Sequence, residues 1–109
     1  MSDTYIPKNL KDSIDTLVGM LSDEDFLSFK NGTEEEMQGQ HHFLGRYLRN
    51  EWGLWQESRL AKWFNNKGIH HADDMSGIIL TSFWRELNSE PIKLDEQIKH
   101  YQDFWEKIK

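Results

Sequence analysis

The chain has 109 residues, a formal net charge of -6 and no cysteine. This length suits one domain that folds without disulfide or metal staples, so we expect a single domain over residues 1–109. The missing cysteine excludes disulfides, thiolate zinc ligands and thiol catalysis, and the acidic balance argues against a nucleic-acid partner, whose phosphates need a basic face.

The N-terminal residues do not look like an export signal. The stretch MSDTYIPKNLKDS lacks the basic segment and the continuous apolar run of a signal peptide. No apolar run in the chain approaches the roughly 20 residues that a membrane span needs. We therefore expect no membrane partner and a cytoplasmic location.

Two helices are predicted at the start of the chain. Ile6-Pro7 should open the first, because proline suits the first helical position, and apolar residues recur at helical spacing as far as Leu21. Ser22, followed by three acidic residues, is typical of a helix N-cap. The second helix should end at Asn31-Gly32.

A third helix should follow Thr33 and Glu36, which have the spacing of a capping box. It should run to about Asn50, and its inward stripe holds Met37, His41, Leu44 and Leu48. Gly53 interrupts the helical spacing, so we expect the backbone to turn there.

Three more helices complete the predicted set. The fourth should follow this turn and end at Gly68. Asp73 or Asp74 should cap the fifth, which stops before Asn88, and the last should span about residues 94–108. Since every segment has helical spacing, we expect an all-α fold, an irregular bundle of five or six helices.

Residues 41–87 concentrate Trp, Arg, His and Asp and form the candidate site. Two interpretations of the charged residues stay open. In one, Arg49 or Arg59 pairs with Asp73 or Asp74 and ties helices together. In the other, these groups line a cleft that binds a ligand. The candidate binding residues are Arg46, Arg49, Asn50, Trp52, Trp55, Arg59, Asp73 and Asp74.

The five tryptophans divide into two groups. Trp63 and Trp105 fall on apolar stripes and should lie in the core, whereas the others lie off those stripes or at their edge. Exposed Trp beside Arg is typical of a protein–protein hot spot. Partial burial of Trp against an Arg side chain is the alternative. The tryptophans at the edge are Trp52, Trp55 and Trp84.

No catalytic residue, metal or cofactor is assigned. His41-His42 and His70-His71 offer nitrogen ligands, but adjacent histidines on a helix point about 100 degrees apart, and His-Glu-x-x-His is missing. No serine lies in a nucleophile elbow. The neighbouring Asp73 and Asp74 are typical of a helix start rather than of an acid/base pair, and no Gly-rich phosphate loop is present.

Two segments carry a resemblance to a known family. They are GRYLRNEWGLWQESR at residues 45–59 and DDMSGIIL at residues 73–80. Together with the leading Ile-Pro, they resemble a family of small bacterial domains of unknown function that has GRxxRNxWxLW and DDMS motifs. The resemblance implies a compact domain and points to these residues, and it supplies no activity.

The preferred hypothesis is a non-enzymatic cytoplasmic module that binds another protein, because the chain is small and acidic, with an aromatic-rich site and no catalytic motif. An immunity-type neutraliser of a basic toxin is one concrete form. The alternative is a small-molecule or metal-dependent hydrolytic site built from the His, Arg and Asp residues. A homodimer joined through exposed Trp is a third hypothesis.

Overall fold

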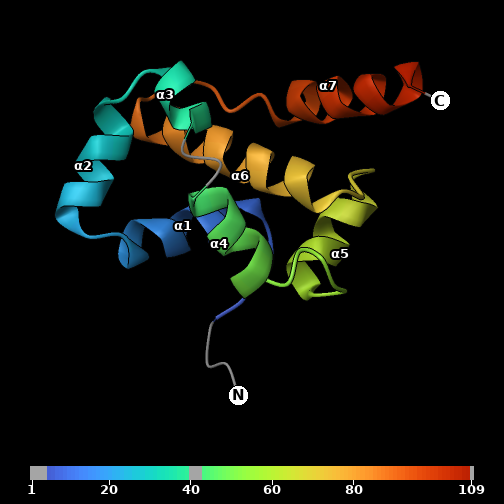
Figure 1. Ribbon diagram of the computed structural model, residues 1–109, viewed down its shortest axis with the longest axis horizontal. Coiled ribbons are helices and arrows are strands. Elements are labelled where there is room, and N and C mark those ends of the chain that lie inside the picture. The colour runs from blue at the N-terminus through green and yellow to red at the C-terminus, as the bar shows by residue number, and fades with distance from the viewer. Residues whose placement is uncertain (1–4, 40–42, 109) are drawn as a thin grey trace.

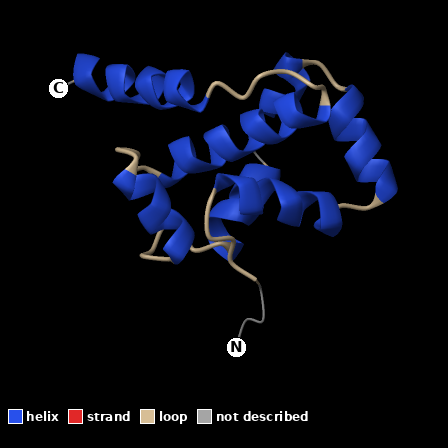
Figure 2. Ribbon diagram, turned by 180° about the vertical axis from the view of Figure 1, so that it is seen from behind, coloured by secondary structure: helices blue, strands red, loops and turns tan. Residues whose placement is uncertain are grey.

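The computed structural model describes residues 5–39 and 43–108, which form seven α-helices and no strand. Figure 2 shows only helices and loops in this part of the chain. The predicted all-α bundle is confirmed. In chain order the helices are α1 Leu10–Met20, α2 Asp23–Asn31, α3 Glu34–Gly39, α4 Leu44–Glu51, α5 Arg59–Asn66, α6 Ala72–Leu87 and α7 Leu94–Lys107.

Helix α6 is the centre of the bundle, because each of the other six helices packs against it (Figure 1). Its residues 74–80 are all buried, including the polar Asp74 and Ser76. A helix that is covered all round needs apolar or small residues on every side. After α6 the chain turns back, so that α7 runs in the opposite direction along it.

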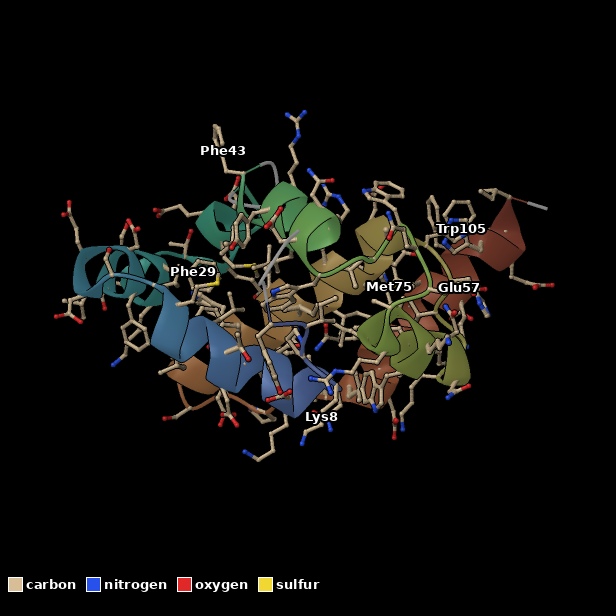
Figure 3. The ribbon with its side chains drawn as sticks, turned by 90° about the horizontal axis from the view of Figure 1, so that it is seen from below. Lys8, Phe29, Phe43, Glu57, Met75 and Trp105 are labelled. Atoms are coloured by element: carbon tan, nitrogen blue, oxygen red, sulfur yellow. The ribbon has the colours of Figure 1, made fainter. Side chains whose placement is uncertain are left out.

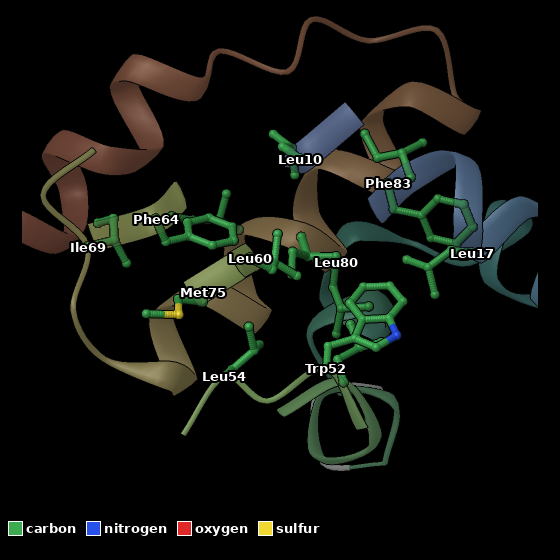
Figure 4. Packing of buried hydrophobic residues seen from close by; sticks show 14 of the residues in the cluster. Leu10, Leu17, Trp52, Leu54, Leu60, Phe64, Ile69, Met75, Leu80 and Phe83 are labelled. Carbon is green, nitrogen blue, oxygen red and sulfur yellow. The ribbon is translucent and has the colours of Figure 1, made fainter. Parts of the chain in front are cut away.

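The buried hydrophobic residues form a cluster to which every helix contributes. Figure 4 shows Trp52 among the leucines of this cluster. Phe29 of α2 stacks on Phe83 of α6 with the ring centroids 5.1 Å apart, and Phe26 meets Phe83 edge-on at 6.5 Å. Such aromatic pairs stabilise a core beyond the area that they bury.

The local signals for α2 and α3 are confirmed. Ser22 caps α2, since its hydroxyl accepts a hydrogen bond from the Asp25 amide at 3.1 Å. Thr33 accepts from the Glu36 amide at 3.1 Å, and the Glu36 carboxylate accepts from the Thr33 amide at 3.5 Å. Both motifs satisfy amides that a helix leaves unpaired at its first turn.

Two predicted helix starts are wrong. The first helix begins at Leu10 rather than at Pro7, because Asn9 caps it by accepting from the Asp12 amide at 2.8 Å. The helix after Gly68 begins at Ala72, and His71 holds the N-cap position without a side-chain cap bond. Asp73 therefore lies in the first turn, where the helix dipole still favours a carboxylate.

The predicted third helix is two helices, α3 and α4, which raises the total to seven. Helix α3 ends at Gly39, and α4 follows at Leu44 in a different direction (Figure 1). Glycine stabilises a helix by about 1 kcal/mol less than alanine, so Gly39 is a weak point in the helical pattern. The predicted inward position of His41 lies outside the described residues.

Candidate functional site

Arg49 on α4 joins this helix to the first turn of α6. Its Nε lies 3.3 Å from Oδ1 of Asp73, and its Nη1 donates to the Ser76 hydroxyl at 2.9 Å. The Arg49 side chain is 14% exposed and the Asp73 side chain 69%. Of the pairs named in the first of the two open interpretations, the structure forms the one between Arg49 and Asp73.

Arg59 lies at the start of α5 and holds the segment that precedes α1. Its Nε donates to the Ile6 carbonyl at 2.7 Å, and its guanidinium lies over the Tyr5 ring, 5.1 Å from the centroid. The Tyr5 hydroxyl in turn donates to Asp12 at 2.5 Å. This bond, with a second from the Lys8 amide, lowers the pKa of Asp12. Arg59 is therefore engaged with the segment before α1, and the ion pairs of the described residues include none between it and Asp73 or Asp74.

Asp74 turns away from Asp73 toward the end of α7. Its buried carboxylate accepts a hydrogen bond from Trp105 Nε1 at 2.7 Å. The Trp105 ring stacks on His71 with the centroids 3.8 Å apart and the planes 16° from parallel. Adjacent helical residues point about 100 degrees apart, so the two aspartates serve different contacts.

A polar pocket of about 480 Å³ lies beside this hydrogen bond. Burial and the nearby charge of Asp74 raise the pKa of Tyr101 in its wall. Sequence reasoning placed Trp105 in the core and missed the pocket. The available signal was the indole N–H, which needs a partner when it is buried. The side chains of the wall include His70, His71, Asp74, Tyr101, Gln102 and Trp105.

The tryptophans differ from the expected grouping. Trp52 is fully buried, and Trp84 is buried with its Nε1 donating to the Gly32 carbonyl at 3.0 Å, so their predicted edge positions are wrong. Trp55 is 63% exposed, in agreement with its predicted position. Trp63 and Trp105, both predicted in the core, are only half-buried.

Trp52 is the C-cap residue of α4 and directly precedes a tight turn at Gly53. Gly53 adopts a left-handed conformation with φ of +64°, as expected from its interruption of the helical spacing. The Trp52 Nε1 atom has no hydrogen-bond partner among the described residues. Its side chain is inaccessible to a partner, whereas Trp55 beyond the turn is accessible.

Helix α4 presents an exposed face that adjoins an apolar groove. Phe43, Arg46, Tyr47 and Asn50 are all exposed, and their spacing of three, four and seven positions places them along one side of the helix. Phe43 is 80% exposed and Tyr47 41%. Figure 3 shows the Phe43 side chain projecting away from the body of the protein.

This groove has a volume of about 470 Å³ and lies between α1, α2, α3 and α4. Phe29 and Met37 form its floor and belong to the core. Sequence reasoning missed the groove, because four helices that are far apart in the chain line it. The local signal was Tyr47, an aromatic residue beside the predicted apolar stripe of Leu44 and Leu48.

The histidines form no metal site within the described residues. No three of the His, Asp and Glu side chains in residues 5–39 and 43–108 are placed to hold one ion. His41 and His42, the other candidate ligands, lie outside these ranges. Over the same ranges, no helix combines the length and the apolar character needed to cross a membrane.

No curated protein and no solved structure matches the chain significantly. One family profile, described as a domain of unknown function (DUF6794), matches residues 6–87. The match contains α1 to α6 in full and ends where α6 ends, so α7 and Trp105 lie outside it. Because it covers more than half of the chain, the chain belongs to the DUF6794 family of domains of unknown function, as the resemblance led us to expect.

Proposed function

We propose that this domain is a non-enzymatic cytoplasmic module that binds another protein. The observation that carries the proposal is the apolar groove beside α4, with Phe43 and Tyr47 exposed along its edge. Aromatic side chains next to a pocket are the groups that most often anchor a protein partner. The groove, with a volume of about 470 Å³, is large enough to take such anchors from a partner.

The groove extends the binding surface predicted from the sequence. Of the candidate residues, Arg46 and Asn50 share the exposed face of α4 with Phe43 and Tyr47. Other members of the candidate set are engaged within the domain: Trp52 is buried, Arg49 and Asp74 make internal contacts, and Arg59 bonds to the Ile6 carbonyl.

An immunity-type neutraliser remains a concrete form of this proposal. A net charge of -6 favours association with a basic protein, because charge complementarity steers encounter and suppresses partners of like charge. A toxin with a basic surface is such a partner. A lack of cysteine suits the cytoplasmic location that the proposal includes.

Photo-cross-linking tests the proposed surface. We would replace Phe43 with p-benzoylphenylalanine in the full chain, irradiate cells of the source organism, and identify cross-linked proteins by mass spectrometry. The matched control places the same residue at Leu27, which is 52% exposed on α2 and does not line the groove. A third variant carries it at Trp55.

The expected result is a discrete adduct at position 43 that position 27 does not give, and that purified partner and domain reproduce. Adducts at position 55 alone would move the binding surface to the turn after α4. No adduct at either position, with all variants folded, would overturn protein binding through this side of the molecule.

The pocket at Trp105 favours a second candidate function, a site for a small polar molecule. Two histidines, two carboxylates, a tyrosine and an amide line its wall, and they supply both donors and acceptors. A thermal-shift screen of metabolites and divalent ions would test it, with Tyr101→Phe as the control variant. A stabilisation that this variant abolishes supports the pocket, and no shift with any compound counts against it.

A further inference from the structure

We propose that the apolar groove takes the apolar face of a basic, amphipathic helix of the partner protein. This inference rests on the proposed function and names the kind of segment that the groove recognises. Its first support is the construction of the site: four helices line the groove, and the buried Phe29 and Met37 close its floor. Because these two floor residues are part of the core, the groove is already formed before a partner helix binds.

The apolar side chains at the groove edge are not used by the core of the domain. Phe43 is 80% exposed, and Met20, at the end of α1, is exposed as well. Tyr47 follows Phe43 by one helical turn, so the two rings form a ridge along α4. A partner helix that places apolar residues at positions i, i+3 or i+4, and i+7 against this ridge would cover them.

The charge around the groove selects a basic partner. Its charged lining residues within the described chain are Asp25 and Glu36, both acidic. The two helices that carry them, α2 and α3, hold six carboxylates and a single lysine. The helix dipole explains why carboxylates gather in these first turns. For a partner the consequence is electrostatic, because lysine or arginine beside the apolar stripe is attracted and acidic residues are repelled.

A helix fits this site better than an extended strand. A bound strand gains most of its affinity by adding to an exposed sheet edge, and the described residues contain no strand. The walls here are helices, against which another helix packs by placing its side-chain ridges into their grooves. A second copy of the chain is the competing occupant, since Phe104 and Ile108 of its α7 region are also exposed.

Binding of designed peptides tests the inference. The probe is a fluorescent peptide of about 14 residues, close to four helical turns, made of leucine on one face and lysine on the other. One control peptide has the same composition with leucine spread around the helix. A second control replaces lysine with glutamate. Fluorescence anisotropy measures the Kd of each peptide for the full-length domain at two salt concentrations.

Wild type and three variants of the domain separate the contributions. Phe43→Ala with Tyr47→Ala removes the ridge, and Asp25→Asn with Glu36→Gln removes the charges while glutamine keeps the capping box. Val18→Ala with Leu27→Ala is the matched control, because both side chains are exposed outside the groove. Circular dichroism and the urea midpoint confirm that each variant folds.

We expect the leucine/lysine amphipathic peptide to bind wild type about tenfold tighter than either control peptide, a difference that one or two anchoring contacts supply. The ridge variant should lose about tenfold in affinity, and the charge variant should bind more weakly with less dependence on salt. The Val18 and Leu27 variant should stay within about twofold of wild type.

Equal binding of the two lysine peptides, or of wild type and the ridge variant, would overturn the inference. So would a dimer in light scattering that the ridge variant dissolves, because the groove would then hold a second copy. Cross-linking separates this failure from that of the proposed function. A partner captured at position 43 through a segment that is neither basic nor helical leaves protein binding intact and refutes the helix.

Discussion

The hydrogen bond from Trp105 to Asp74 gives the end of α7 a specific place beside the start of α6. We expect Trp105→Phe to lower the free energy of unfolding by about 1.5–3 kcal/mol, because it leaves a buried carboxylate without its donor. Urea unfolding measures this change. In the Trp105→Phe background, Asp74→Asn should cost less than it does in wild type, since the amide carries no charge. Strictly additive losses would contradict this account.

Tyr101 makes the stability of the fold sensitive to alkaline pH. Burial, and next the charge of Asp74, raise its pKa above the usual value of 10.0. The folded state therefore keeps the phenol proton at a pH where the unfolded state has lost it. This contribution to stability is fully present below pH 10 and is lost as pH rises through the folded pKa.

The measurement compares wild type with Tyr101→Phe. The difference between their free energies of unfolding should be constant from neutral pH up to the usual pKa of 10.0, and should then shrink as the pH rises further. Urea titrations at fixed pH supply both curves. A difference that does not change across this range would show that Tyr101 ionises equally in both states.

At the scale of helices and turns, two glycines in different conformations respond in opposite ways to alanine. Gly53 has φ of +64°, and a Cβ there would lie 3.0 Å from Cβ of Ser58, whereas Gly19 in α1 has open space around it. Gly53→Ala should destabilise the fold by about 1 kcal/mol or more, and Gly19→Ala should stabilise it by about 0.5–1 kcal/mol. Thermal unfolding tests both signs, and equal shifts would contradict the assignment of the turn.

Arg49 stabilises the contact between α4 and α6 more through its hydrogen bond to Ser76 than through its ion pair with Asp73. Asp73 is largely exposed, so Asp73→Asn should cost less than about 1 kcal/mol. Arg49→Met should cost more, because the guanidinium also donates to the buried Ser76 hydroxyl. Unfolding of the two single variants and the double variant measures the coupling. Equal losses in the single variants would refute this ranking.

At the scale of the whole molecule, α6 should be the most protected segment in hydrogen exchange. All six other helices pack against it, so its amides are released only when the whole fold opens. The amides of α7, which packs on α6 at the outside of the bundle, should exchange faster (Figure 1). Exchange followed by NMR tests this order. Equal protection of α6 and α7 would mean that the bundle opens as a single unit.

The predictions from the sequence are most reliable where residues close together in the chain determine the structure. Caps and turns were predictable at Ser22, at Thr33 with Glu36, and at Gly53, because neighbours within a few residues determine them. The start of α1 was mistaken, because a proline and an asparagine both offered a helix start and the asparagine side chain made the cap. Helical spacing also ran through Gly39, at which α3 ends.

The sequence by itself determined the helical class, most of the caps and membership of a family of unknown function. Only the tertiary structure decided which tryptophans are buried, where Asp74 finds its donor 31 residues away, and that four helices enclose the groove. The physical reason is that spacing and capping act between near neighbours, whereas burial and pocket shape depend on how distant helices pack around α6.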